Sequence, residues 1–389
     1  MSADEYPPPP RRLRLGMVGG GRGAFIGAVH RIAARMDDRY EFVAGAFSSD
    51  PARARASAAD LRIAPDRAYA DFRAMAAAES NRPDGIDVVA IVTPNNMHYA
   101  PARAFLECGI DVICDKPLTS KLEDALELEK VARQSSLVFG VTYNYTGYPL
   151  VRQARALIAG GELGAIRVVQ VEYAQDWLTT KLEETGHKGA VWRTDPEQCG
   201  IAGSIGEIGT HAINLAEFVS DLRIEAVAAD LATCVPGRRL DDNAGVLLRF
   251  EGGARGMLWT SQVAVGRENG LSLRVYGEKG SLEWAQEEPN ALRFVRFGEA
   301  PQTMTRAGAG SRPEALRATR VPSGHPEGYL EAFAQLYRDF AEQISARREN
   351  RPCDPASLGV PGIEEGVRGM RFVAAAVASS TGGSRWTTL

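Results

Sequence analysis

Residues 13–30, LRLGMVGGGRGAFIGAVH, place an apolar run directly before a glycine-rich turn that leads into a helical pattern. Glycine lacks a Cβ atom, so Gly19 and Gly21 allow the backbone to turn sharply and to approach a ligand closely. The free N–H groups at the start of the following helix attract a phosphate. This order predicts a turn that binds the pyrophosphate of a dinucleotide. We expect the contacts to come from Gly19, Gly21, Arg22, Gly23, Ala24, Phe25 and Ile26.

The spacing of the glycines departs from the usual G-x-G-x-x-G pattern, because Gly27 follows Gly21 by six residues. We therefore expect a longer loop than is standard. The residues downstream support the assignment, since a helical pattern over 24–36 and a strand-like run over 40–47 complete one βαβ unit. A tight turn without any ligand is the alternative, and this context disfavours it.

Composition excludes several classes of protein. The net charge is −4 and the arginines are spread along the chain, so we expect no nucleic-acid partner. The chain has neither a membrane-length apolar run nor a secretory signal, which predicts a cytoplasmic protein without a membrane partner. The five cysteines have no C-x-x-C spacing, which argues against a disulfide framework or a zinc site, and we expect no metal.

The pattern of apolar residues predicts an α/β protein with two domains. Residues 1–12 form a flexible, proline-rich tail, and residues 13–148 alternate apolar strands with helices, as in a Rossmann domain with a parallel sheet. From residue 149 to 389 we expect a second α/β domain with a large, open, mainly antiparallel sheet. Two helices are predicted there, over 210–219 and from 326 to about 347.

One helix in the first domain is expected to begin with a capping box. Ser120 is followed three residues later by Glu123, a spacing at which the two side chains bond to free N–H groups at a helix start. The next helix, from residue 149, is expected to stop at Gly160 and Gly161.

Candidate functional residues lie where the later strands of the first domain end. TPNNMH, residues 93–98, follows one strand, and DKPLT, residues 115–119, follows the next. An open parallel sheet binds ligands at the carboxyl ends of its strands. Both loops are therefore predicted to reach one ligand site.

These two loops and the glycine turn resemble the Gfo/Idh/MocA family of nicotinamide-dependent oxidoreductases, in which Glu-Lys-Pro is usual where this chain has Asp115-Lys116-Pro117. The resemblance continues through WRTDP (192–196), GSIGEIGTH (203–211) and GHPEGYLEAF (324–333). It implies a Rossmann domain followed by a domain with an open sheet, with substrate between that sheet and the nicotinamide. It also implies a homodimer or homotetramer.

The resemblance further implies three catalytic residues. Lys116 would hold the reacting hydroxyl and stabilise negative charge on its oxygen. His211 would accept the hydroxyl proton, which suits an imidazole. Glu207 stands four residues before His211, where the family usually has Asp, so its carboxylate reaches one methylene further. Whether Glu207 contacts substrate, Lys116 or His211 is left open.

The cofactor is expected to be NAD, with NADP as the alternative. Ser48 and Ser49 end the second strand where a carboxylate would bind ribose hydroxyls, and with Arg53 they could also hold a 2′-phosphate. The family's Trp-Arg pair, here Trp192 and Arg193, packs against the cofactor. The remaining predicted cofactor contacts follow strand ends: Thr93, Pro94, Asn95, His98, Asp115, Lys116 and Asn144.

The substrate is expected to be a sugar or polyol. Aromatic planes, carboxylates and amides suit the faces and hydroxyl edges of a sugar ring, and the predicted contacts are Tyr145, Asp176, Trp177 and His325. The joint presence of the phosphate-binding turn, Asp115-Lys116-Pro117 and the pair of Glu207 and His211 predicts transfer of a hydride from a secondary hydroxyl of a sugar, glycoside or cyclitol to the nicotinamide. Two alternatives remain: a redox-neutral glycosidase that oxidises the sugar only transiently, and a non-catalytic regulator that binds the cofactor.

Overall fold

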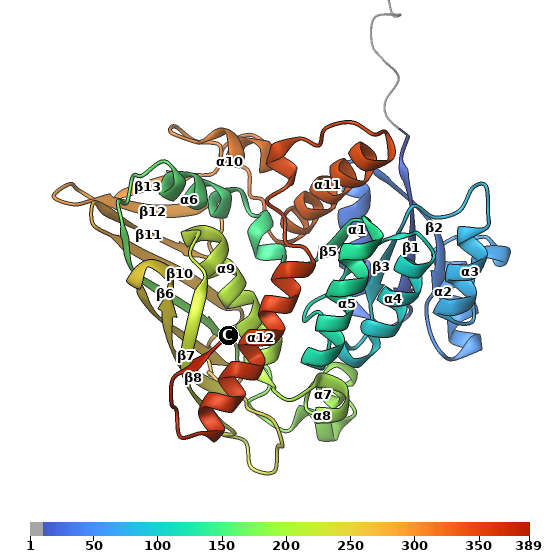
Figure 1. The fold of residues 1–389 in the computed structure, drawn as a ribbon, viewed down its shortest axis with the longest axis horizontal. Coiled ribbons are helices and arrows are strands. Elements are labelled where there is room, and N and C mark those ends of the chain that lie inside the picture. The colour runs from blue at the N-terminus through green and yellow to red at the C-terminus, as the bar shows by residue number, and fades with distance from the viewer. Residues whose placement is uncertain (1–10) are drawn as a thin grey trace, which may run out of the picture.

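The computed structural model describes residues 11–389, so most of the predicted tail lies outside the described residues. The chain forms two sheets, with the helices packed between and around them (Figure 1). Within the described residues, no helix combines the length and the apolar character needed to cross a membrane.

The first sheet is parallel and buried on both faces, as its continuous apolar strands require. All five residues of the strand Val88–Val92 are buried. The strand order is β2-β1-β3-β4-β5, with β1 (Leu13–Gly19), β2 (Tyr40–Ala46), β3 (Val88–Val92), β4 (Asp111–Cys114) and β5 (Phe139–Val141). The helices of this part are α1 (Phe25–Met36), α2 (Pro51–Asp60), α3 (Phe72–Ser80), α4 (Tyr99–Glu107) and α5 (Leu122–Ser135). The predicted Rossmann architecture is confirmed.

The second sheet is mainly antiparallel, as predicted, with one parallel pair between β6 and β9. Buried and exposed residues alternate along its central strands, so one face is covered and the other is open. The order is β13-β12-β11-β10-β6-β9-β8-β7-β14, with β6 (Ile166–Ala174), β7 (Ile224–Ala232), β8 (Asn243–Phe250), β9 (Arg255–Ser261), β10 (Gly270–Gly277), β11 (Gly280–Ala285), β12 (Ala291–Arg296), β13 (Gln302–Thr305) and β14 (Thr387–Thr388).

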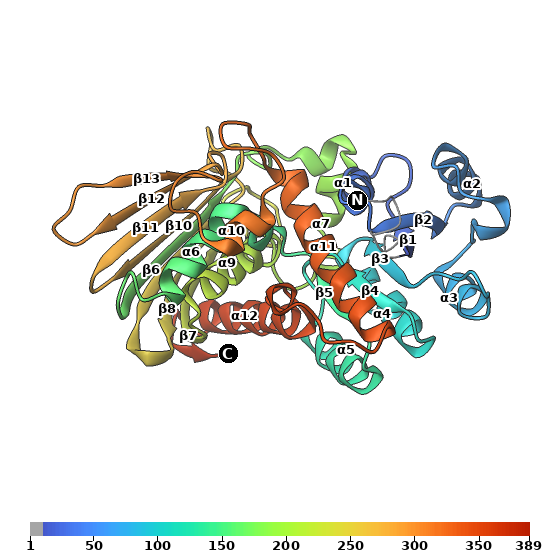
Figure 2. The ribbon, with the colours of Figure 1, turned by 90° about the horizontal axis from the view of Figure 1, so that it is seen from above.

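The helices that follow residue 148 pack against both sheets. Those after residue 148 are α6 (Pro149–Ala159), α7 (Lys188–Arg193), α8 (Pro196–Cys199), α9 (Thr210–Ser220), α10 (Pro313–Ala318), α11 (Tyr329–Arg348) and α12 (Ile363–Thr381). Side chains of α6, α9 and α12 pack on the covered face of the second sheet. Helix α11 lies beside α1 over the first sheet (Figure 2). The division at residues 148/149 stays a prediction, since α11 belongs to the predicted second domain and yet covers the first sheet.

The glycine turn brings α1 very close to β1. A Cβ atom at Gly27 would lie 2.4 Å from the Cα atom of Gly20 and 2.6 Å from its carbonyl oxygen. Gly27 therefore permits the close packing of helix and strand, which is the role of the third glycine in the usual pattern. In this chain that glycine comes later than in the usual pattern. Gly19 has a φ of +81°, which favours glycine.

The predicted capping box at Ser120 is wrong. Helix α5 begins at Leu122, its N-cap is Lys121, and no side chain in the described part of the chain caps it. Ser120 is buried, and its carbonyl oxygen would lie only 2.6 Å from a Cβ atom at Gly200. Ser120 therefore packs against the segment that contains Gly200, and it lies before the first residue of α5. By contrast, α6 ends at Ala159, directly before Gly160, as predicted.

Candidate active site

Hydrogen bonds join the loops that follow β3, β4 and β5 of the first sheet. These bonds hold the loop that carries Lys116 in position. Asp115 directly follows β4, and its Oδ1 atom accepts hydrogen bonds from the N–H of Lys116 at 2.9 Å and from the hydroxyl of Thr142 at 2.8 Å. Thr142 follows β5, so one carboxylate holds two neighbouring loops together. The peptide bond between Lys116 and Pro117 is cis.

His98 connects the loop after β3 to the loop after β4. Its Nδ1 atom lies 2.9 Å from the carbonyl oxygen of Pro117, and its Nε2 atom lies 2.9 Å from that of Thr93. The ring is buried, and both nitrogens face protein carbonyls. A cofactor contact by His98 stays a prediction, while the geometry shows a side chain that ties together two loops of the site.

Glu207 lies at the centre of a cluster of charged and polar side chains. Its Oε2 atom accepts a hydrogen bond from Nε of Arg193 at 2.8 Å, and its Oε1 atom accepts one from Nδ2 of Asn95 at 2.9 Å. The Nζ atom of Lys116 donates to the backbone carbonyl of Glu207 at 2.9 Å and lies 3.6 Å from Oε2. The sequence left the partner of Glu207 open, and the structure pairs it with Lys116 and Arg193.

The charges of this cluster keep Glu207 ionised. Burial raises the pKa of the Glu207 carboxyl, but the charges of Lys116 and Arg193 outweigh burial and, with the hydrogen bond from Asn95, lower this pKa from 4.5 to about 2. The site therefore holds a buried carboxylate between two cations.

A π-helical turn positions Glu207. The turn η5 (Ile205–Gly209) runs directly into α9, and such turns are frequent at functional sites. Asp241, from the loop between β7 and β8, caps its start. The carboxylate of Asp241 accepts hydrogen bonds from the N–H groups of Gly203 at 2.7 Å and Ile205 at 2.9 Å. Asp241 is a positioning residue that sequence reasoning missed, because only the fold brings it to this turn.

His211 lies in an aromatic cage on α9. Its ring centroid is 4.9 Å from that of Tyr145, 5.6 Å from that of Tyr143 and 6.3 Å from that of Tyr173, all with edge-to-face geometry. Burial, followed by the charge of Lys116, lowers the pKa of His211 well below its ordinary value. The imidazole is therefore neutral at pH 7, which is the form that can accept a proton.

Glu207 does not orient His211. No hydrogen bond joins the two among residues 11–389, and the buried Nδ1 atom of His211 has no partner there. In a regular α-helix, a spacing of four residues would place both side chains on one face. The π-helical turn explains the difference, because its wider winding changes the angle between residues four apart.

The glycine turn and an unpaired amide fit a bound dinucleotide. The turn from Gly19 to Gly23 leads into α1 and offers a close approach at the helix start. The buried Nδ2 atom of Asn144, in the segment after β5, has no hydrogen-bond partner among the described residues. Since a buried amide normally has a partner, this side chain is available to a ligand.

The residues at the end of β2 are engaged in local contacts. The hydroxyl of Ser48 accepts a hydrogen bond from the N–H of Asp50, and Asp50 caps α2 through the N–H of Arg53. The guanidinium of Arg22 forms an exposed ion pair with Asp60 on α2. The structure therefore brings α2 against the glycine turn.

The predicted substrate residues fall into two groups. The Tyr145 ring packs on His211, and the Trp177 ring lies 5.9 Å from the guanidinium of Arg193, so both adjoin the charged cluster. The carboxylate of Asp176 accepts a hydrogen bond from Gly266, after β9. His325 is exposed, and its carbonyl binds Arg306; within residues 11–389 it has no hydrogen bond to the cluster. Its role stays a prediction.

A hydrogen-bonded chain behind Tyr145 was not predicted. The hydroxyls of Tyr145 and Tyr173 are 2.5 Å apart, and the Tyr173 hydroxyl donates to Oδ1 of Asn269 at 2.8 Å. Tyr173 has one hydroxyl proton and gives it to Asn269, so Tyr145 is the donor in the first bond. The alternation of apolar and polar residues along β6 would have allowed a prediction that Tyr173 lies on the covered face of the sheet. Nothing in the sequence points to Asn269.

Removing the charge of Glu207 is expected to change how stability depends on pH. The unfolded carboxyl binds protons more readily than the folded one, so its contribution is full above pH 4.5 and is lost as the pH falls toward about 2. For the Glu207→Gln variant, the difference from wild type in the free energy of unfolding should shrink by roughly 2 kcal/mol between pH 5 and pH 3. Urea titrations at both pH values measure this, and a difference independent of pH would contradict the assigned ionisation.

Comparison with known proteins places the chain in a family. Residues 13–143 match the family described as "Oxidoreductase family, NAD-binding Rossmann fold", and residues 151–283 match "GFO/IDH/MocA C-terminal domain". The chain therefore belongs to the Gfo/Idh/MocA family of oxidoreductases, and its first part is an NAD-binding Rossmann domain.

Individual relatives cover nearly the whole chain. An uncharacterized oxidoreductase of Bacillus subtilis (strain 168) is 35% identical over 377 residues, which are 96% of each chain. The crystal structure of an oxidoreductase from Sinorhizobium meliloti is 54% identical, with a TM-score of 0.89 over 97% of this chain and 99% of that one. An inositol dehydrogenase homolog from Azotobacter vinelandii, complexed with NAD+, is 40% identical, with a TM-score of 0.93 over 97% and 98% of the chains. Another structure of such a homolog, complexed with NADH and myo-inositol, is 39% identical, with a TM-score of 0.89 over the same shares.

Proposed function

We propose that the protein is an NAD-dependent dehydrogenase that oxidises a secondary hydroxyl of a sugar, glycoside or cyclitol. The observation that carries this proposal is that a lysine ammonium and a buried histidine both lie at strand ends of the Rossmann domain, Lys116 after β4 and bonded to the carbonyl of Glu207, and His211 packed on Tyr143 after β5. Lys116 is bonded to the carbonyl of Glu207, and Glu207 lies in the turn that runs directly into the helix of His211. Such a pair can bind an alcohol oxygen and accept its proton.

Each residue of the pair has a separate task. Lys116 donates an N–H to the alcohol oxygen and stabilises the negative charge that develops there. His211 accepts the hydroxyl proton. Glu207 remains ionised and binds Arg193, and its backbone carbonyl fixes the position of Lys116. When bound, NAD+ supplies the acceptor for the hydride.

The cofactor contacts that we propose are ones that the sequence predicts. The turn at Gly19 and Gly21 with the start of α1 would hold the pyrophosphate, and Asn144 with the strand-end loops would lie beside the nicotinamide. The ion pair of Arg22 with Asp60 supports NAD over NADP, because it engages a guanidinium that would otherwise attract a 2′-phosphate.

The proposed substrate class rests on side chains around the pair. Tyr145 and Trp177 offer aromatic faces beside His211 and Arg193, which suits the apolar faces of a polyhydroxylated ring. A relative that is 39% identical has been crystallised with NADH and myo-inositol. We infer that cyclic polyols are the first compounds to test.

The test uses the purified protein with NAD+ and NADP+ separately, against myo-inositol, glucose and an aryl glycoside. Absorbance of the reduced nicotinamide and release of the aglycone are followed together. Net oxidation of a polyol with NAD+ supports the proposal. Aglycone release without accumulating NADH would instead indicate a redox-neutral glycosidase. No reaction with any compound, although NAD+ binds, would favour a regulator.

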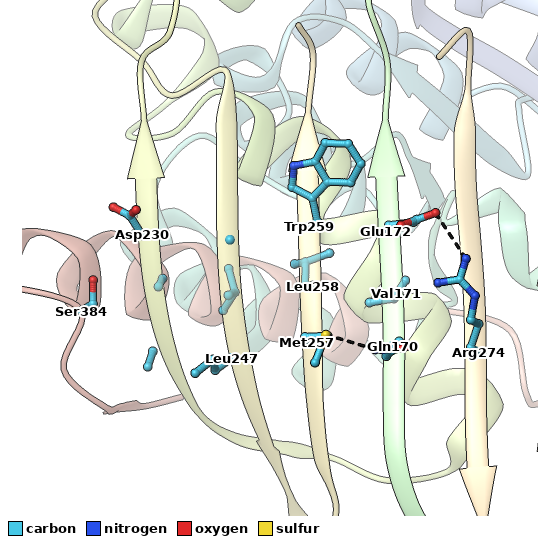
Figure 3. Close-up of a pocket in the computed structure, with 14 residues that line it drawn as sticks. Gln170, Val171, Glu172, Asp230, Leu247, Met257, Leu258, Trp259, Arg274 and Ser384 are labelled. Carbon is cyan, nitrogen blue, oxygen red and sulfur yellow. Dashed lines mark hydrogen bonds and ion pairs between the residues drawn. The ribbon is translucent and has the colours of Figure 1, made fainter. Parts of the chain in front are cut away.

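We also propose that a second copy of the chain covers the open face of the second sheet. Figure 3 shows this face, on which Trp259, Met257 and Leu247 stand around a hollow of about 440 Å³. These side chains are 38%, 45% and 53% exposed. Apolar groups gathered in this way mark interaction sites.

A charge on this face is expected to weaken assembly. The Trp259→Glu variant should sediment as a smaller species than the wild type at the same concentration, because a carboxylate would be buried without a partner. Leu316→Glu, at an exposed apolar residue on α10, serves as the control. If wild type and Trp259→Glu sediment identically, this face is not the interface.

A further inference from the structure

Lys116 is only lightly engaged by its neighbours. Among residues 11–389, its Nζ atom donates one hydrogen bond, at 2.9 Å, to the backbone carbonyl of Glu207. The Oε2 atom of the same residue is 3.6 Å away, which is too far for a hydrogen bond. An ammonium has three N–H donors, so two remain available to a ligand.

The carboxylate of Glu207 forms an ion pair with Lys116 at 3.6 Å but no hydrogen bond, and two other donors hold it at hydrogen-bond distance. Asn95 donates to Oε1 at 2.9 Å, and Nε of Arg193 donates to Oε2 at 2.8 Å. Asn95 also donates to the carbonyl of Cys199 at 3.1 Å, so it is fixed from both sides. Each carboxylate oxygen thus has a partner other than Lys116.

Arg193 is itself held rigidly. Its guanidinium lies 4.1 Å from the centroid of the Trp192 ring, and its Nη1 atom donates to the carbonyl of Gly189 at 3.2 Å. Arg193 was predicted from the sequence as a cofactor contact. In the structure its shortest hydrogen bond is to Glu207, which indicates a different task.

We propose that Arg193 is a positioning residue that keeps the carboxylate of Glu207 beyond hydrogen-bond distance of Lys116, so that the ammonium keeps two N–H groups for the alcohol oxygen. This inference rests on the proposed function. Two buried opposite charges attract strongly when nothing competes, so without Arg193 the carboxylate turns to Lys116. The ammonium is then neutralised by its neighbour and is less able to stabilise a developing alkoxide.

The variants Arg193→Met, Arg193→Lys and Arg193→Met/Glu207→Gln test this role. Arg193→Met should lower kcat by roughly 10- to 100-fold with myo-inositol, or with the panel compound that reacts fastest. Its Kd for NAD+ should stay within about threefold of wild type. Arg193→Lys should restore much of the loss. The double variant should be faster than Arg193→Met, because glutamine has no charge to bring to Lys116.

A measurement without turnover separates this inference from the proposed function. Reductive methylation by formaldehyde and cyanoborohydride, read by mass spectrometry, reports how free each of the six lysines is. Methylation of Lys116 relative to the exposed Lys130 should be slower in Arg193→Met than in wild type. Arg239→Met, at an exposed arginine that pairs with Asp195, should leave this ratio unchanged.

Two results would overturn the role assigned to Arg193. The first is a Kd for NAD+ raised tenfold or more in Arg193→Met with kcat unchanged, which would make Arg193 a cofactor contact. The second is unchanged methylation of Lys116 together with a double variant no faster than Arg193→Met. If the wild type oxidises no polyol, the proposed function fails. The ratio of Lys116 to Lys130 methylation then tests by itself whether Arg193 positions the carboxylate of Glu207.

Discussion

The Lys116→Met variant is expected to lose catalysis while it keeps its cofactor. Methionine preserves the length of the side chain but removes the ammonium that donates to the carbonyl of Glu207. Losing one donor that stabilises a developing oxyanion typically lowers kcat by about 100- to 1,000-fold, and we expect a loss of this size here. Steady-state kinetics with the best polyol of the panel measures this loss.

Folding should survive this change, because Glu207 keeps its bonds to Arg193 and Asn95. The Kd for NAD+, measured by calorimetry, should therefore stay close to that of the wild type. Lys130→Met is the matched control, since the side chain of Lys130 is 71% exposed and lies outside the site. A Lys116→Met protein with more than a tenth of the wild-type kcat would contradict the role of the ammonium.

The Gly27→Ala variant is expected to lose cofactor binding. The added Cβ atom would meet the backbone of Gly20 at 2.4 Å, and a backbone atom cannot move aside as a flexible side chain can. Helix α1 must shift away from β1 and carries the start of the phosphate-binding turn with it. The Kd for NAD+ should rise by about 100-fold, and the overpacking should destabilise the fold by about 1–3 kcal/mol.

Gly23→Ala is the control for this prediction, because it changes a glycine of the same turn. A Cβ atom at Gly23 meets nothing within 4 Å, although its φ of +77° is strained for alanine. Strain of this kind is worth about 1–2 kcal/mol, so the Kd should rise far less than in Gly27→Ala. Calorimetry and thermal unfolding of both variants check this. Equal losses in the two would show that the close packing of α1 is not what matters.

The local sequence predicted the first sheet well because each of its strands is a continuous apolar run. It did not predict α12, which carries Gly366 and Gly369 in its first turns. A Cβ atom at Gly369 would lie 2.4 Å from the hydroxyl oxygen of Tyr143, so this glycine serves packing against another segment. Glycine weakens helical propensity locally, and only the tertiary contact explains its presence.

The candidate site, like the fold, was predicted only in part. Lys116, His211 and Glu207 were identified from motifs, and the structure brings all three to the strand ends of the Rossmann domain. Their assigned roles remain predictions. The partners of Glu207 were not predictable, because Arg193 is separated from it by fourteen residues and Asn95 by 112. Asp241 was missed for the same reason.

The transfer of hydrogen from a ring carbon to the cofactor tests the central claim most directly. The protein is incubated with NAD+ and myo-inositol deuterated at its ring carbons, and the cofactor is analysed by mass spectrometry. The account predicts deuterium in the reduced nicotinamide of the wild type, and a much slower transfer in Lys116→Met. If the protein binds NAD+ but no deuterium reaches the cofactor from myo-inositol or from any other deuterated sugar of the panel, the account is wrong.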